Sequence, residues 1–179
     1  MKNILAVALI IFSLSGFSQD IGLELGFGSF KAKATDGTSS ESTDSYSGVT
    51  TGFVVNFILS ESLKLETGLG FAFRKYEGES DNSWGIPVIA KYYTNTASGF
   101  HLRAGLGYSA TLEDVDTTLV KKDALSAGFG FGYDIDDNFT IVAEYSTQLS
   151  NSLSPDAGAE YEGITVKGSG FGVSLQYFF

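Results

Sequence analysis

The last ten residues of the chain, Gly170 to Phe179, read G-F-G-V-S-L-Q-Y-F-F. Every second residue from Phe171 to Phe179 is aromatic or aliphatic, and small or polar residues stand between them, with Phe178 as the one departure. This period of two is that of a β-strand whose two faces meet different surroundings. The stretch therefore predicts an amphipathic strand that runs to the final residue.

Seven more segments show the same alternation, which predicts eight strands in total. Most span about nine to thirteen residues, enough for a tilted strand to cross a bilayer. The composition agrees, because 22 Gly, 15 Phe and 9 Tyr beside only two Pro are typical of many short strands. The predicted strands occupy residues 20–32, 49–59, 63–75, 85–93, 100–112, 124–133, 139–149 and 164–179.

The alternation alone leaves open which face of the sheet is inside. In a soluble barrel of the lipocalin kind the large apolar side chains would point inward, yet an eight-stranded barrel has an interior only just wide enough to be filled by side chains. The opposite face is dominated by glycine with a few charges, which suits a narrow lumen. We therefore expect an all-β protein, an eight-stranded antiparallel up-and-down transmembrane β-barrel with its apolar face toward lipid.

The connections between the predicted strands alternate between long and short. Residues 33–48, 76–84, 113–123 and 150–163 are long and polar, whereas residues 60–62, 94–99 and 134–138 are tight turns. Outer-membrane barrels pair long extracellular loops with short periplasmic turns, so we expect both chain ends on the periplasmic side. The predicted loops are acidic, through Asp36, Glu41, Asp44, Glu77, Glu79, Asp81, Glu113, Asp114, Asp116, Asp123, Asp156, Glu160 and Glu162.

Aromatic residues gather near the ends of the predicted strands, where membrane barrels carry girdles at the lipid boundary. A general preference of aromatic residues for strands explains their number but not this placement. On the outer side the predicted girdle contains Tyr46, Tyr76, Trp84 and Tyr108. On the periplasmic side it contains Tyr92, Tyr93, Phe100, Tyr133, Phe139, Tyr177 and Phe179.

Residues 1–18 are predicted to be a cleavable signal peptide, and residues 19–179 the barrel domain. Lys2 precedes an apolar core too short to span a bilayer as a helix, and small residues precede Gln19. Removing this segment takes away one Lys and no acid, so the net charge changes from −10 to −11, with 10 Lys plus Arg against 21 Asp plus Glu. Nucleic acid is therefore not an expected partner. The lack of cysteine excludes disulfides and a cysteine-linked lipid anchor.

The closing stretch resembles the last strand of Gram-negative outer-membrane barrels, which the barrel assembly machinery engages. This resemblance implies an assembly signal at Leu175, Tyr177 and Phe179. The stretch from Gly85 to Thr94 reads G-I-P-V-I-A-K-Y-Y-T. It resembles a middle strand of the PorT-like outer-membrane β-barrel domain family, whose members are small barrels of the OmpX/OmpA-like kind. Three later segments are similar to the strands that follow this middle strand in the family: F-H-L-R-A-G-L-G-Y-S, G-F-G-F-G-Y-D and N-F-T-I-V-A-E-Y-S.

The resemblance implies a place in the outer membrane of a Gram-negative bacterium. Outer-membrane lipid, lipopolysaccharide and the assembly machinery are then the expected partners, and we expect a monomer. These motifs are strand patterns and not chemical signatures, so they leave the function open.

Several charged residues fall on the face predicted to line the lumen. Charges buried in a narrow lumen are costly unless they pair, so we expect carboxylates to gather around Arg103. Such a network would either hold the wall together as a plug or act as a gate for a small solute. The predicted lumen charge network consists of Glu24, Glu66, Lys91, Arg103 and Glu144, with Arg74 higher up.

No catalytic, cofactor-binding or metal-binding residues are expected. His101 is the only histidine, so a multi-histidine metal site is excluded, and it lacks the nearby Ser that outer-membrane lipid A deacylases carry on the same strand. The acidic loops lack the spacing of a calcium loop. The closely spaced glycines precede no predicted helix, which argues against a phosphate-binding loop.

Three functions from different classes remain open. The first is a non-enzymatic structural, membrane-anchor or surface-interaction protein that acts through acidic extracellular loops. The second is a narrow pore or transporter for small solutes, suggested by the glycine-rich inner face. The third is a lipid-modifying enzyme, suggested only by His101.

Overall fold

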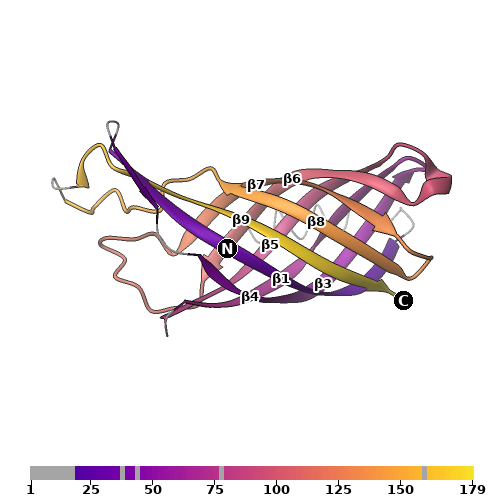
Figure 1. The fold of residues 1–179 in the computed structure, drawn as a ribbon, viewed down its shortest axis with the longest axis horizontal. Coiled ribbons are helices and arrows are strands. Elements are labelled where there is room, and N and C mark those ends of the chain that lie inside the picture. Colours follow the sequence, from indigo (N-terminus) through magenta and orange to yellow (C-terminus); the bar gives the residue numbers. More distant parts are fainter. Residues whose placement is uncertain (1–18, 37–38, 43–44, 77–78, 159–160) are drawn as a thin grey trace, which may run out of the picture.

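The computed structural model describes residues 19–36, 39–42, 45–76, 79–158 and 161–179 (Figure 1). The predicted signal peptide, residues 1–18, lies outside the described part of the chain. Within that part, no helix has the length and apolar character needed to cross a membrane.

Nine strands and one short 3₁₀ helix make up the described structure. Strand order in the sheet is β2-β1-β3-β4-β5-β6-β7-β8-β9, all pairings are antiparallel, and β9 also pairs with β1. The eight long strands therefore close into the predicted barrel, and the three-residue β2 adds to one end of β1. The elements are β1 (Gln19–Thr35), β2 (Ser40–Ser42), β3 (Tyr46–Ser60), β4 (Leu63–Tyr76), β5 (Glu79–Tyr93), η1 (Thr96–Ser98), β6 (Phe100–Thr111), β7 (Asp123–Asp134), β8 (Phe139–Gln148) and β9 (Thr165–Phe178).

The two ends of the barrel differ in their connections. We call the end with the short connections 61–62, 94–99 and 135–138 the turn end, and the end with residues 112–122 and 149–164 the loop end. Figure 1 shows the turn end on the right, where the carboxyl terminus lies, and the loop end on the left. The long connections after β6 and β8 thus confirm two of the predicted loops.

Closure of the barrel depends on the pairing of the first long strand with the last. The β1–β9 register runs from Gly22 opposite Phe178 to Thr35 opposite Thr165. The ladder continues to the last residue, because the Phe179 amide donates to the Ile21 carbonyl at 2.9 Å. This pairing removes the open sheet edge, which hydrocarbon would not tolerate.

The apolar face of each strand points out of the barrel and the small or polar face points in, as predicted. Leu25 and Phe129 each keep 62% of their surface exposed, whereas Glu66 keeps 1% and Gln176 none. Phe57 departs from this pattern, since it is buried beside the register shift between Ile58 and Ser60.

Two of the predicted loops are wrong in extent. Residues 33–48 and 76–84 are instead largely strand, because β1 continues to Thr35, β3 begins at Tyr46 and β5 begins at Glu79. Their Ser, Lys and Asp side chains lack the apolar alternation that marks a strand against lipid. Strand pairing itself needs only backbone hydrogen bonds, so the sheet continues beyond the apolar belt.

The aromatic girdle is confirmed at the turn end except for Tyr93, and Tyr46 is a correction to the girdle predicted for the other end. Tyr92, Tyr133 and Phe179 are exposed on the outer face. Tyr93 is buried, because it follows the outward-facing Tyr92 and therefore points inward. Tyr46 is placed opposite Phe30, on the inward-facing side of β1 and β3.

A charged residue on the outer face should destabilise the barrel strongly at mid-strand and little in a loop. We expect Phe129→Arg, in the middle of β7, to lower the free energy of unfolding in lipid vesicles by about 2–4 kcal/mol, because an arginine at the bilayer midplane lacks water. The measurement is urea unfolding followed by the fluorescence of the single tryptophan, Trp84.

Leu119→Arg is the matched control, since Leu119 is exposed in the 112–122 loop. We expect it to change the stability by less than about 0.5 kcal/mol. Equal effects of the two variants would contradict the outward orientation of the apolar face.

Candidate functional site

The centre of the lumen holds a group of paired charges, which we call the lumen charge cluster: Glu24, Glu66, Lys91, Arg103 and Glu144. Arg103 on β6 and Glu66 on β4 form its core. The Arg103 guanidinium donates from Nη2 to Glu66 Oε1 at 2.6 Å and from Nη1 to Glu66 Oε2 at 3.2 Å. Both side chains are almost fully buried, so this two-bond geometry compensates charges that water does not reach.

Lys91 supplies the second cation of the cluster. Its Nζ lies 3.4 Å from Glu66 Oε2 and 3.5 Å from the amide oxygen of Asn56, and 5.4 Å from the centre of the Phe178 ring. Lys91 and Arg103 are direct neighbours in the β5–β6 register. Glu66 therefore separates two buried cations that would otherwise repel each other.

The other two carboxylates contact the core of the cluster less closely. Glu144 Oε2 is 3.6 Å from Arg103 Nε, and Arg103 Nε is buried without a hydrogen-bond partner. Glu24 accepts a hydrogen bond from Gln176 Nε2 at 2.8 Å. Arg103 is thus matched in charge, but its Nε donor is left without a close acceptor.

Arg74 lies apart from the cluster, toward the loop end. It donates to Asp81 Oδ2 at 2.7 Å and its guanidinium lies over the Phe30 ring at 5.2 Å. Asp81 was assigned to a loop by the sequence pattern, but it faces Arg74 across the β4–β5 ladder. Arg74 therefore forms a separate ion pair within the lumen.

His101 lies between the cluster and the turn end, in full burial. Its Nδ1 is 3.3 Å from the Gly99 carbonyl and 3.6 Å from Asp134 Oδ1, and its ring centre is 4.7 Å from that of Tyr93. Nε2 faces Gly132, where any larger side chain would collide with the ring. These contacts are those of a packed structural histidine that a substrate does not reach.

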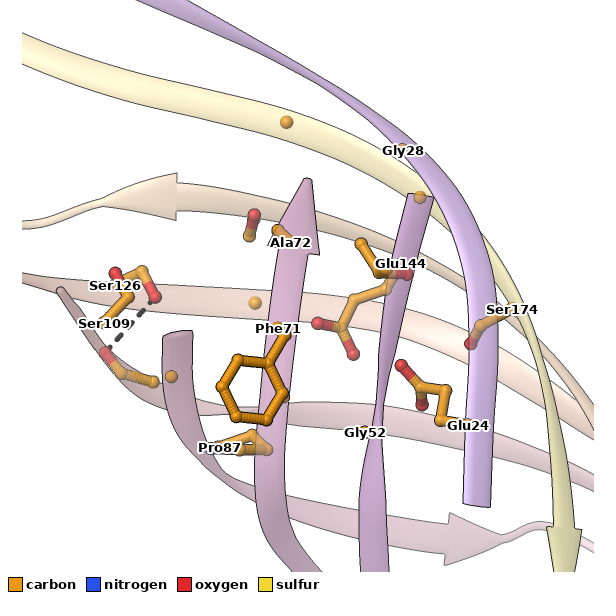
Figure 2. A pocket seen from close by; sticks show the side chains of 18 of the residues that line it. Glu24, Gly28, Gly52, Phe71, Ala72, Pro87, Ser109, Ser126, Glu144 and Ser174 are labelled. Atoms are coloured by element: carbon orange, nitrogen blue, oxygen red, sulfur yellow. Dashed lines mark hydrogen bonds between the residues drawn. The ribbon is translucent and has the colours of Figure 1, made fainter. Parts of the chain in front are cut away.

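A cavity of about 310 Å³ occupies the lumen on the loop side of the cluster. Figure 2 shows Glu24 and Glu144 pointing into it, and Glu66 and Arg103 also line it. Its walls include nine glycines and six serines, among them Gly52, Gly128, Ser109, Ser126 and Ser174. Lys91, His101 and Phe178 are not part of the lining, so the cavity ends at the cluster.

The chemistry available in the lumen is that of charge and hydrogen bonding. Within the described ranges, no group of three or more His, Asp or Glu residues is arranged to hold a metal ion. The cavity offers two carboxylates, Glu24 and Glu144, beside the buried Arg103 Nε. Such a surface suits water or a small polar solute.

The predicted lumen charge network left out several polar residues that lie in the lumen. Asp134, assigned to a turn, accepts hydrogen bonds from Tyr93 Oη at 3.0 Å and Thr140 Oγ1 at 2.7 Å. Asn56 and Gln176 complete the contacts of Lys91 and Glu24. The period of two already placed Asn56, Thr140 and Gln176 on the inward-facing side, but it did not show which charged residues they contact. The same phase places Tyr93 and Asp134 inward.

The residues of the predicted assembly signal lie on the outer face of the closing strand. Leu175, Tyr177 and Phe179 are exposed, and the Tyr177 ring packs against Phe139 at 4.9 Å and edge-on against Phe179 at 5.5 Å. The three side chains thus form a continuous apolar row at the turn end.

Removing one partner of the buried ion pair should cost more than removing all of the buried charges. We expect Arg103→Ala to lower the free energy of unfolding by about 3–5 kcal/mol, because Glu66 is left with Lys91 alone. The free energy of unfolding should fall much less in the combined variant Glu66→Leu, Lys91→Met and Arg103→Met, since that variant leaves no unpaired charge in the core. Urea unfolding in lipid vesicles measures both, and a triple variant less stable than Arg103→Ala would contradict this account.

Comparison with solved structures shows the same fold in other membrane barrels. Ail, the attachment invasion locus protein of Yersinia pestis, is similar with a TM-score of 0.53 and 12% identity, over 90% of this chain and 99% of that chain. Ail in complex with the heparin analogue sucrose octasulfate gives a TM-score of 0.50 and 13% identity over the same shares. At these identities the similarity shows the fold alone.

No curated protein matches this sequence. The family model of the outer membrane protein beta-barrel domain matches residues 4–179, which is nearly the whole chain. This match agrees with the closed eight-stranded barrel and its apolar outer face. The chain therefore belongs to the outer membrane protein beta-barrel domain family and is an integral protein of the Gram-negative outer membrane.

Proposed function

We propose that this protein is a non-enzymatic outer-membrane barrel that serves as a membrane anchor and presents its loops for surface interaction. The observation that carries the proposal is the filling of the lumen between the cavity and the turn end. Glu66, Lys91 and Arg103 form a nearly fully buried layer across it, and His101, Tyr93 and Phe178 are buried beyond. A barrel filled in this way acts through its surfaces.

The loop end supports this proposal because its two long loops are joined into one surface. Lys121 donates from its amide to the Ser152 carbonyl at 2.8 Å, and Ser154 donates to the Leu119 carbonyl at 2.9 Å. A β-bridge between Val120 and Leu153 adds to these contacts. The joined loops carry exposed apolar residues, including Leu119 and Val120, beside several carboxylates. Loops fixed in this way offer a defined surface to a partner.

An enzymatic role finds no support in the surroundings of His101. Its partners are a carbonyl, a carboxylate and an aromatic ring, and its side chain is wholly buried. A lipid substrate would have to reach it from outside the wall. We therefore propose a non-enzymatic role.

A narrow pore for small solutes is the second candidate, and one observation favours it. The cavity of about 310 Å³ has charged side chains in its walls and ends at the lumen charge cluster, so that cluster and the residues beyond it interrupt the lumen. Rearrangement of the Arg103–Glu66 pair would be needed for passage.

Conductance distinguishes the two candidates. We expect the purified protein to show no steady conductance in planar bilayers, because the buried layer at Arg103 blocks water and ions. Steady conductance of the wild type would contradict the role as a filled anchor. If Arg103→Ala changes that conductance and Arg74→Ala does not, the result favours the pore. Arg74 is the matched control, since its ion pair with Asp81 lies outside the cluster.

We further propose that the loop end faces the cell exterior and the turn end the periplasm. Residues 1–18 would then be the cleaved signal peptide, the mature monomer would begin at Gln19, and Leu175, Tyr177 and Phe179 would bind the assembly machinery. The stretch Gly85 to Thr94 supports a place among the PorT-like barrels within the larger family. Long loops outside and short turns inside are usual for outer-membrane barrels.

The lack of cysteine permits a direct test of this orientation. We expect Thr117→Cys, in the 112–122 loop, to react with a membrane-impermeant maleimide on intact cells. Asp137→Cys, in the 135–138 turn, should react only after the outer membrane is opened. Both positions are exposed, so access to the reagent depends on the side of the membrane. The reverse pattern of labelling would contradict the proposed orientation.

A further inference from the structure

Two carboxylates of the lumen charge cluster each begin a row of three inward-facing glycines in the strand register. The row from Glu24 crosses β3, β4 and β5 through Gly52, Gly70 and Gly85. The row from Glu144 crosses β9, β1 and β3 through Gly172, Gly28 and Gly48. Five of these six glycines line the cavity, so the two rows account for the space beside the carboxylates.

At two of these positions the packing of the backbone does not require glycine. A Cβ atom added at Gly70 would have its nearest neighbour at 3.9 Å, and one added at Gly172 at 3.7 Å, which are ordinary van der Waals distances. A Cβ atom at Gly85 would instead lie 2.9 Å from the Tyr108 carbonyl oxygen. Glycine weakens the interior of a strand because it has no side chain to pack. The open space at Gly70 and Gly172 is therefore not a by-product of close strand packing.

The cluster carries one more negative than positive charge. It has three carboxylates, and its two cations are Lys91 and Arg103. Both cations contact Glu66, with Arg103 Nη2 at 2.6 Å and Lys91 Nζ at 3.4 Å. On the loop side, Arg74 is already paired with Asp81. Apart from residues 1–18, the segments outside the described ranges contain no Lys, Arg or His: 37–38, 43–44, 77–78 and 159–160.

Glu24 and Glu144 present free oxygen atoms to the cavity (Figure 2). Glu24 Oε2 accepts a hydrogen bond from the Gln176 amide, and Glu144 Oε2 is 3.6 Å from Arg103 Nε, beyond hydrogen-bond length. Within the described residues, neither carboxylate accepts a hydrogen bond from a cationic group. A carboxylate can accept several hydrogen bonds, so both can take donors from a ligand.

A buried donor faces the same space. Arg103 keeps only 3% of its surface exposed and lines the cavity, and its Nε has no hydrogen-bond partner. A buried donor without an acceptor costs free energy. The missing acceptor is an observation independent of the charge balance, and it indicates that a ligand carries an acceptor atom close to its positive charge.

Apolar side chains lie beside the carboxylates. Val142 precedes Glu144 by two residues on the inward-facing side of β8, and Val54 follows Gly52 by two on β3. Both valines line the cavity and are almost fully buried. Apolar walls with a few convergent polar groups are typical of small-molecule sites, and about 310 Å³ lies at the lower end of their usual size.

An organic cation fits this cavity better than a metal ion does. In the part of the chain that the structure describes, no three His, Asp or Glu residues are arranged to hold a metal ion. An ammonium group has several donors, and its carbon chain can contact the valines.

We propose that the cavity binds a small hydroxylated ammonium ion, such as an amino alcohol. Its ammonium group donates hydrogen bonds to Glu24 and Glu144, and its hydroxyl oxygen accepts one from Arg103 Nε. Phe30 and Arg74 line the loop side of the cavity and are partly exposed, so the ligand enters from the loop end. This site goes beyond the anchor role, because a lumen closed at the cluster can hold a ligand without conducting.

Titration of the isotopically labelled full barrel with ethanolamine, in neutral detergent micelles, tests this proposal. The amide chemical shifts of the lining glycines locate the site and give the dissociation constant. The test variant is Glu24→Gln with Glu144→Gln, which removes two charges and keeps the shape of the side chains. We expect it to bind about 100-fold more weakly, about tenfold for each charge-assisted hydrogen bond.

The matched control removes two carboxylates from the surface. Asp156→Asn with Glu162→Gln changes the same charge at exposed positions of the 149–164 loop. We expect this control to bind ethanolamine as the wild type does. An equal loss of affinity in the control would overturn the site in the lumen.

Filling the cavity separates the role of space from the role of charge. Gly172→Leu places a side chain in the lumen without removing any charge, and should weaken ethanolamine binding at least about tenfold. Gly70→Ala with Gly172→Ala adds only two Cβ atoms where there is room for them, and should weaken binding by a smaller factor. Heat-dependent gel migration verifies that each variant is folded. Unchanged affinity in the folded variants would overturn the site.

Three further probes test the chemistry of the ligand. Propylamine has a methyl group in place of the hydroxyl group and should bind about fivefold more weakly, because Arg103 Nε stays without an acceptor. Ethylene glycol lacks the positive charge and should not bind, and sodium chloride should leave the glycine shifts unchanged. Equal binding of propylamine or ethylene glycol, or equal shifts with sodium chloride, would overturn the assignment to a hydroxylated ammonium ion.

Binding and conductance are separate readouts, so the site and the anchor role can fail independently. Ethanolamine binding together with steady conductance would support the site and reject the filled anchor. A closed barrel whose glycine shifts do not respond to ethanolamine would reject the site and leave the anchor standing.

Discussion

The pairing of β1 with β9 is the constraint on which the rest of the structure depends. An unpaired backbone group in hydrocarbon costs several kcal/mol, so the sheet has to close. Because side chains alternate with a period of two, closure in this register also decides which residues face the lumen. It places Glu24 directly opposite Gln176, and their side chains form a hydrogen bond across the seam.

The closed barrel has a narrow lumen, and that width determines how its charges are arranged. Glu66, Lys91 and Arg103 are too deeply buried for water to compensate, so they compensate one another. Glu24 and Glu144 stand at the edge of this layer, where the cavity begins, and need fewer protein contacts. The division of the lumen into a filled part and a cavity thus follows from the depth at which each charge is placed.

The faces of the strands were predictable from the sequence, and the contacts within the lumen were not. The period of two puts Glu66 and Arg103 inside, but their pairing depends on the stagger between strands, which places Ile89 and not Lys91 opposite Glu66. Tyr93 was assigned to the girdle because it ends a strand, although its phase already placed it inward. Asp81 could not be linked to Arg74, because that part of β5 lacks apolar alternation.

The wall of the barrel is uneven in height, and this unevenness separates two kinds of surface. β1, β3, β4, β5 and β9 have 14 to 17 residues, whereas β6, β7 and β8 have 10 to 12. The taller side carries four exposed lysines, Lys31, Lys33, Lys75 and Lys167, and the shorter side leads into the joined acidic loops. Cations inside the barrel are matched by carboxylates of the chain, because no other anion reaches them. The outer face of the barrel has no such charge to compensate at mid-strand, because residues such as Leu25 and Phe129 are apolar and face the lipid.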